Sequence, residues 1–176
     1  TRERESGSLD LLFISPLKSW EIILSKTIPY VVVAFTTEAT ILLFARFWFG
    51  IPFRGSLLVL AFFSLLFIIT GLSMGILIST VTTSQRSAMF AALMATMLPS
   101  LLLSGFIFPL DSLAPVLRGF SYLVPATYFL KILRGIVLKG APLSDFWSQG
   151  AAMFLFASTL LTMATLRFNA QRGKPL

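Results

Sequence analysis

The chain has 176 residues, of which 56% are hydrophobic and only 12% are charged, with 18 phenylalanines and a formal net charge of +7. A water-soluble domain carries about a quarter charged residues, so this composition excludes a soluble globular protein and indicates an integral membrane chain. The chain contains neither cysteine nor histidine, which excludes disulfides, thiol nucleophiles, thiolate metal sites and histidine-based catalysis.

The first 26 residues combine alternating charges with a short amphipathic pattern ahead of the first apolar run. Ser8 and Asp10 suit the start of a short helix, and the pair Ser15-Pro16 ends it and begins another. The apolar residues fall on about one face: Leu9, Leu12, Phe13, Leu17, Trp20, Ile23 and Leu24. The pattern predicts a helical elbow at the membrane surface, and its simplest interpretation is an amphipathic anchor.

Four apolar stretches are long enough to span a bilayer, because about 20 helical residues cross ~30 Å of hydrocarbon. We expect transmembrane helices near residues 28–49, 56–80, 87–108 and 148–167, within a transmembrane domain of residues 27–176 that follows the segment 1–26. An even number of spans puts both ends on one side of the membrane.

The basic residues give a weak indication of the orientation. The side that holds both ends carries Arg2, Arg4, Lys18, Lys26, Arg86, Arg167, Arg172 and Lys174, and the other side holds the remaining lysines and arginines of the 14 in the chain. The positive-inside rule therefore favours cytoplasmic ends. Because both surfaces are basic, the charge indicates contact with lipid headgroups, and we expect no nucleic-acid partner.

Glu38 interrupts the first expected span near its middle. A carboxylate at that depth costs about 2.5 kcal/mol or more to insert, so it usually faces protein or a wet cavity. Thr36, Thr37 and Thr40 flank it. Two interpretations stay open: Glu38 is protonated or hydrogen-bonded at a helix interface, or it lines a substrate path.

The second expected span contains "GLSMG" at Gly71 to Gly75, which matches the G-x-S-x-G nucleophile pattern. That motif needs a strand-to-helix turn and a histidine base, and neither is compatible with an apolar run in this chain. Gly71, Gly75 and Ser79 instead form a small-residue stripe, typical of a face that a neighbouring helix approaches closely. The sequence has no phosphate-binding loop motif and no cluster of metal-ligating residues, so we expect no catalytic residue, cofactor or metal in this chain.

Residues 110–145 are too punctuated by proline and charge to cross the bilayer twice. A helical stripe nevertheless runs through this region, opposed by Lys131 and Arg134, and consists of Phe129, Ile132, Leu133, Ile136 and Val137. On the residues alone, it is most simply a helix lying on the membrane surface.

Four segments resemble, in order, the permease subunits of ABC-2 type exporters. "RERESGSLDLLFISPLKSWEIILSKTIPY" is similar to the signature that precedes the family's third transmembrane helix. "IPFRGS", "LPSLLLSGFIFPLDSLAP" and "YLVPATYFLKILRGIVLKG" are similar to its later segments. The resemblance is to the C-terminal half of such permeases, which carry two further helices before it. One departure is Val124, because family members usually have asparagine before the proline at position 125.

The resemblance implies an all-α polytopic membrane protein in which four transmembrane helices follow a cytoplasmic amphipathic coupling helix. That helix would contact an ABC ATPase subunit through Arg4, Glu5, Leu9, Asp10, Leu12 and Phe13. Residues 110–145 would form an external re-entrant helical hairpin, and the external region would include Pro109, just before it, together with Pro125, Tyr128 and Arg134. ATP and Mg²⁺ would be bound by the ATPase, and a second permease copy or paralogue would complete a dimer in the cell membrane. The alternative function is a non-transporting membrane anchoring or assembly protein.

Overall fold

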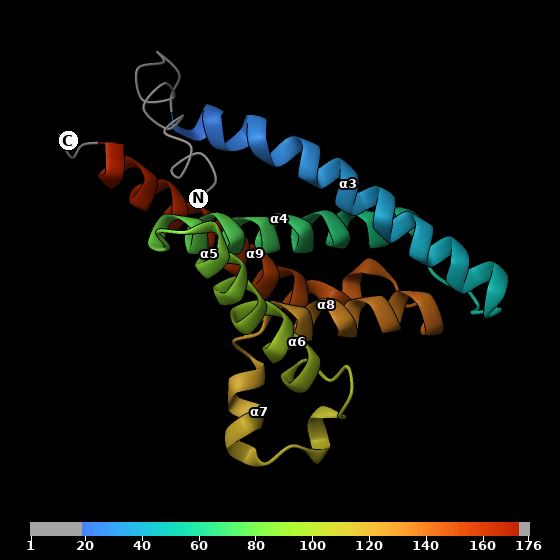
Figure 1. Ribbon diagram of the computed structural model, residues 1–176. Helices are drawn as coiled ribbons and strands as arrows, with labels where there is room; N and C mark the ends of the chain where they lie inside the picture. The colour runs from blue at the N-terminus through green and yellow to red at the C-terminus, as the bar shows by residue number, and fades with distance from the viewer. Residues whose placement is uncertain (1–18, 173–176) are drawn as a thin grey trace.

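The computed structural model describes residues 19–172, which form helices joined by short loops (Figure 1). The α-helices are α3 (Ser19–Trp48), α4 (Leu57–Val81), α5 (Gln85–Ala92), α6 (Leu98–Leu103), α7 (Pro115–Ser121), α8 (Pro125–Arg134) and α9 (Trp147–Arg172). Two π-helical segments, Leu93–Met97 and Gly135–Lys139, and two 3₁₀ turns, Leu110–Ser112 and Leu143–Phe146, lie between them.

Four helical stretches of the described chain are long and apolar enough to cross a membrane. Their bounds are Thr27–Trp48, Leu57–Val81, Gln85–Leu103 and Leu143–Arg167. The start of α3, the turn between α4 and α5, and the end of α9 lie at one end of the molecule, on the left of Figure 1. The expected all-α polytopic fold with four spans is therefore confirmed.

Helix α3 runs through the expected segment boundary near residue 26. It is continuous over 30 residues, from Ser19 to Trp48, so residues 19–26 belong to the same helix as the first span. Pro29 lies inside this helix without ending it. A proline removes only one backbone donor and is tolerated in membrane helices, where neighbouring groups can satisfy the freed carbonyl.

The third span is shorter than expected: its helix ends at Leu103 instead of continuing to residue 108. Gly105 has φ +86°, a left-handed conformation that suits glycine and ends the helix. Immediately before Pro99, the helix widens into the π-helical segment Leu93–Met97. A proline cannot donate the regular hydrogen bond and clashes with the carbonyl four residues earlier, which accounts for this change of winding.

The buried core lies between α4, α8 with its π-helical extension, and α9. Its buried members are Leu60, Phe63, Ile132, Ile136, Val137, Phe146 and Met153. Phe129 and Leu133 pack against this cluster, so the predicted stripe of residues 129–137 is confirmed as the buried face of α8 and its extension. Ile132 and Ile136 are fully buried, so this face of the segment packs on other parts of the protein.

Three glycines allow this core to close. A Cβ atom at Gly55 would lie 2.5 Å from the carbonyl oxygen of Ile136, and one at Gly135 would lie 2.5 Å from Cζ of Phe146. A Cβ atom at Gly150, in α9, would lie 2.8 Å from Cε1 of Phe63 in α4. These distances are shorter than non-bonded contacts allow, so a side chain at any of these positions would displace the backbone of Ile136 or the ring of Phe146 or Phe63.

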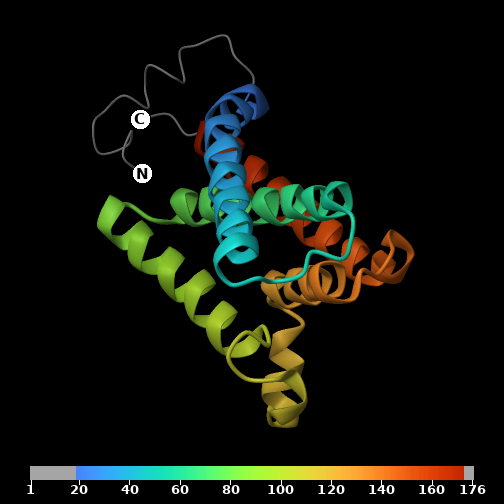
Figure 2. The ribbon, with the colours of Figure 1, turned by 90° about the vertical axis from the view of Figure 1, so that its right-hand side faces the viewer.

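Helix α7 and the helix formed by α8 with its π-helical extension are a bent pair. The segments Pro115–Ser121 and Pro125–Lys139 meet at an angle of 84°. Helix α7 projects from the bundle beside the end of α6, whereas α8 lies against α4 and α9 (Figures 1 and 2). Such a geometry is that of a broken span or a re-entrant segment.

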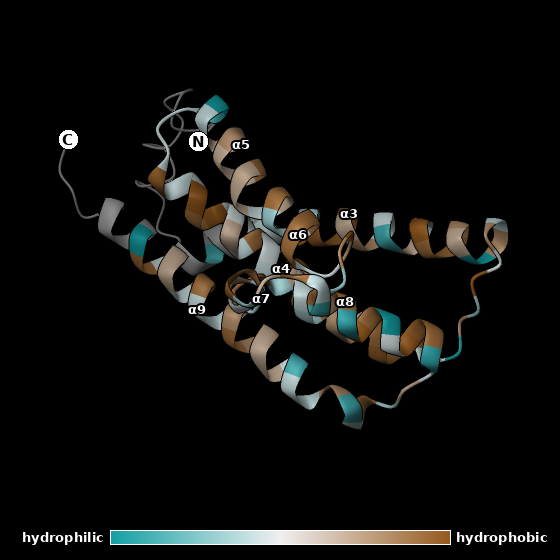
Figure 3. Ribbon diagram, turned by 90° about the horizontal axis from the view of Figure 1, so that it is seen from below, coloured by the Kyte–Doolittle hydropathy of each residue, from teal (hydrophilic) through white to brown (hydrophobic). Residues whose placement is uncertain are grey.

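The outer helices α3 and α5–α6 lie along this core without buried residues in their spanning windows. Figure 2 shows the rod of α5 and α6 diverging from α4, with α3 on another side. Most residues of the spanning helices are hydrophobic, and hydrophilic residues lie at the start of α5 and along α8 (Figure 3). Apolar side chains facing outward are what a bilayer accommodates.

Candidate functional site

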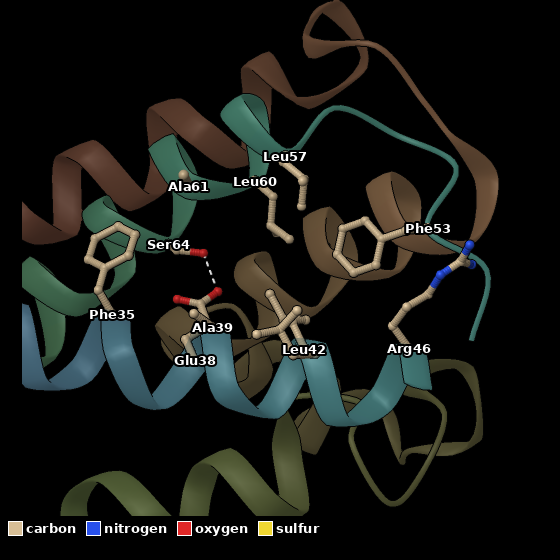
Figure 4. Close-up of a pocket in the computed structure, with 11 residues that line it drawn as sticks. Phe35, Glu38, Ala39, Leu42, Arg46, Phe53, Leu57, Leu60, Ala61 and Ser64 are labelled. Atoms are coloured by element: carbon tan, nitrogen blue, oxygen red, sulfur yellow. Dashed lines mark hydrogen bonds between the residues drawn. The ribbon is translucent and has the colours of Figure 1, made fainter. Parts of the chain in front are cut away.

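Glu38 lies where α3 packs on α4. The hydroxyl of Ser64, on α4, donates a short hydrogen bond to Oε1 of Glu38 (Figure 4). Ser64 is 1% exposed, so its hydroxyl group is satisfied inside the protein by this carboxylate. The contact joins two helices through the one acidic side chain of the first span.

The threonines beside Glu38 do not contribute to this contact. The hydroxyl groups of Thr36, Thr37 and Thr40 each donate to the carbonyl oxygen four residues earlier in α3, at 2.8 Å. This arrangement satisfies a polar side chain within its own helix and is common for threonine in membrane helices. The polar character of the site therefore comes from Glu38 and Ser64.

A pocket of about 500 Å³ lies between α3, α4 and the loop that joins them. Glu38 and Ser64 form part of its wall, and most of the rest is apolar, including Phe35, Leu42 and Phe53. Figure 4 shows the carboxylate pointing from α3 toward α4 across the pocket. The volume lies within the range of about 300–1,000 Å³ typical of small-molecule sites.

Arg46 lines the same pocket at the end of α3. One of its guanidinium nitrogens donates to the carbonyl oxygen of Ile51 at 3.4 Å, which directs the charge toward the α3–α4 loop. In Figure 4 this guanidinium group lies away from Glu38. The two side chains therefore do not form an ion pair, and Glu38 is left as the acidic group of the pocket interior.

Both interpretations of Glu38 thus have a structural counterpart. The hydrogen bond from Ser64 is the interface contact, and the pocket is a space that Glu38 lines. These two roles are compatible, because one hydroxyl donor occupies only part of the acceptor capacity of a carboxylate.

Arg134 connects α8 to the end of the third span. A guanidinium nitrogen donates to the carbonyl oxygen of Gly105 at 3.0 Å, across 29 positions of sequence. Tyr128, also on α8, donates from its hydroxyl group to the carbonyl oxygen of Tyr122 at 2.9 Å. Pro125 occupies the first turn of α8, whereas Pro109 is exposed before a 3₁₀ turn.

The α7–α8 bend is closed by Thr127. Its hydroxyl group donates to the carbonyl oxygen of Ser121 at 2.7 Å, and both residues are buried. Val124, which replaces the asparagine usual in the resembled family, is 7% exposed and provides no side-chain cap for α8. The bend is thus stabilised from inside α8 rather than from the position before the proline.

The two glycines of the small-residue stripe of α4 do not face another helix of the described chain. A side chain at Gly71 or Gly75 would meet nothing within 4 Å, and both glycines are exposed. A close helix approach along Gly71, Gly75 and Ser79 stays a prediction for a partner outside the described residues.

The expected ATPase-contact residues lie outside the described residues 19–172: Arg4, Glu5, Leu9, Asp10, Leu12 and Phe13. Conversely, sequence reasoning missed Ser64 and the three core glycines. A serine inside an apolar span was the only signal for Ser64, and Gly55, Gly135 and Gly150 belong to no repeating pattern.

Comparison with known proteins gives one coherent result. The model of the family described as "ABC-2 family transporter protein" matches residues 1–166. Relatives in Escherichia coli K12 include the probable multidrug ABC transporter permease YbhS, 42% identical over 79% of this chain and 37% of its own length. The probable multidrug ABC transporter permease YbhR is 36% identical over 96% of this chain and 45% of its own length.

A more distant relative is ABC transporter G family member 20 of Dictyostelium discoideum, 26% identical over 96% of this chain and 23% of its own length. The chain thus spans less than half the length of these curated relatives. No solved structure is significantly similar to it.

Proposed function

Because the chain belongs to the ABC-2 family of transporter proteins, we propose that it forms membrane-spanning helices of an ABC exporter permease. The observation that carries the proposal is the family match over residues 1–166, which includes all four candidate spans almost completely. Relatives named as permeases at 36% and 42% identity support the same assignment.

In this proposal the chain moves substrate and a separate ABC ATPase subunit supplies the energy. The ATPase binds ATP and Mg²⁺, so this chain needs no cofactor of its own. A second permease copy or paralogue completes a dimer, and the complex exports its substrate across the cell membrane. The apolar outer faces of α3 and of α5–α6 support a chain that is surrounded by lipid and by further helices.

In this proposal, force from the ATPase reaches the pocket through α3. Helix α3 is continuous from Ser19 to Trp48, and Glu38 lies 19 residues from its start, or about 28 Å along the axis. An unbroken helix transmits an axial shift along its length. Since α3 has few contacts with the core, closure of the ATPases against the preceding segment would move α3 relative to α4 and alter the pocket between them.

Purification of the whole permease from its natural host tests this function. We expect an ATPase with a phosphate-binding loop to co-purify, and inverted vesicles that contain both proteins to accumulate substrate only with ATP. Orthovanadate should abolish this uptake. A permease that associates with no ATPase would contradict the proposal and support the anchoring alternative.

The proposed orientation predicts a labelling pattern. Because the chain has no cysteine, Thr83→Cys and Ser144→Cys each introduce one thiol, at exposed positions near opposite ends of the spans. We expect a membrane-impermeant maleimide to label Ser144→Cys in intact cells and Thr83→Cys only after permeabilisation. The reverse pattern would show that the ends of the chain are not cytoplasmic.

A further inference from the structure

The pocket between α3 and α4 has an unusual combination of one carboxylate and an apolar wall. Leu57 and Leu60 come from α4, Phe35 and Leu42 from α3, and these side chains surround the approach to Glu38. Ser64 donates one hydrogen bond, to Oε1 of the carboxylate. The other oxygen atom, Oε2, has no hydrogen-bond donor recorded within residues 19–172 and is available to a guest.

No basic side chain neutralises this carboxylate from the pocket wall. Arg46 is the one basic residue among the described residues that line the pocket, and it lies eight positions along α3, or about 12 Å. Its guanidinium group already donates to the Ile51 carbonyl oxygen. A carboxylate with no basic partner in its pocket attracts an opposite charge that comes within about 4 Å.

We infer that this pocket binds a lipophilic organic cation, whose charged centre lies beside Glu38 and whose apolar groups contact Phe35, Leu42 and Leu60. The positive charge of the cation complements the carboxylate of Glu38, and the apolar groups of the cation contact the apolar wall of the pocket in place of membrane lipid. An anion of the same shape would be repelled, and a neutral molecule would lack the ionic contribution. That such a cation is also exported rests on the function proposed above.

The test is equilibrium binding of tetraphenylphosphonium to the whole permease in phosphatidylcholine nanodiscs without nucleotide, with empty nanodiscs to subtract partitioning into lipid. Wild-type protein should show saturable binding. Glu38→Gln keeps the size and the hydrogen-bond acceptor but removes the charge, and should weaken binding at least about tenfold, or ~1.4 kcal/mol. Glu38→Asp retains the charge and should stay within about threefold of wild type, or ~0.65 kcal/mol.

A second variant tests the cavity without changing its charge. Ala61 lines the pocket one turn before Ser64, so Ala61→Phe should fill part of the space and reduce binding even though Glu38 is intact. Tetraphenylborate, an anion of closely similar shape, should show no Glu38-dependent binding. Unchanged tetraphenylphosphonium affinity in both Glu38→Gln and Ala61→Phe, or equal saturable binding of the anion, would overturn the inference.

ATPase co-purification separates this inference from the proposed function. Glu38-dependent binding in a permease that recruits no ATPase would support the cation site and contradict the exporter. A permease that recruits its ATPase but binds the cation independently of Glu38 would support the exporter and contradict the site.

Discussion

Replacing Gly150 with leucine is expected to lower the free energy of unfolding by about 3 kcal/mol, the upper part of the range for overpacked cores. The first added carbon would already lie 2.8 Å from Cε1 of Phe63, and the leucine adds three more. Phe63 is 2% exposed and packs edge-to-face on Phe146 at 6.2 Å between ring centroids. Because both rings are confined, α9 must move away from α4, which is its principal packing partner.

Gly75→Leu is the matched control. Both substitutions replace a glycine inside a spanning helix with leucine, so both gain helix propensity by a similar amount, at most about 1 kcal/mol. A side chain at Gly75 meets nothing within 4 Å, so we expect Gly75→Leu to change the free energy of unfolding of the isolated chain by no more than this gain of about 1 kcal/mol. Thermal or denaturant unfolding in detergent micelles measures the difference.

Equal stability of the two variants would contradict the α4–α9 packing described above. Oligomeric state provides a second measurement on the same proteins. If Gly71, Gly75 and Ser79 contact another chain, Gly75→Leu should reduce dimer formation while the folded monomer persists.

Leu12→Asp is expected to remove the ATPase from the purified permease. Leu12 lies outside the described residues, and its role follows from the family resemblance and from the apolar face that it shares with Leu9 and Phe13. Burial of an uncompensated carboxylate in a desolvated contact costs several kcal/mol. A loss of 2 kcal/mol or more, as at interface hot spots, corresponds to affinity weaker by about thirtyfold or more.

Leu11→Asp is the control for this change, because the sequence pattern predicts residue 11 on the side of the short helix opposite to Leu9, Leu12 and Phe13. It introduces the same charge next to Leu12 and should leave ATPase binding close to wild type. Co-purification and substrate-stimulated ATP hydrolysis, with membrane insertion verified by the labelling described above, provide the measurements. Retention of the ATPase by a correctly inserted Leu12→Asp permease would refute the coupling role and favour a membrane anchor.

Sequence reasoning located the membrane spans because a span is a local property of composition and length. It also identified the stripe of residues 129–137 from the helical period, since the side chains of one face recur at fixed spacing whatever they pack against. The residues at which the helices end were harder to predict from the sequence. The third helix stops at Leu103 because Gly105 takes a left-handed conformation, and an apolar run that continues to residue 108 gives no sign of this.

The sequence by itself thus determined the class of protein, its number of spans and the presence of a costly carboxylate at residue 38. Only the tertiary structure decided what that carboxylate contacts, because Ser64 lies 26 positions away and the pocket exists only where α3 meets α4. The same holds for the glycines. Regular spacing pointed to Gly71 and Gly75, whereas the core closes on Gly55, Gly135 and Gly150. Those three matter because α8 and its extension fold back against α4 and α9, and a contact between distant segments leaves no period in the sequence.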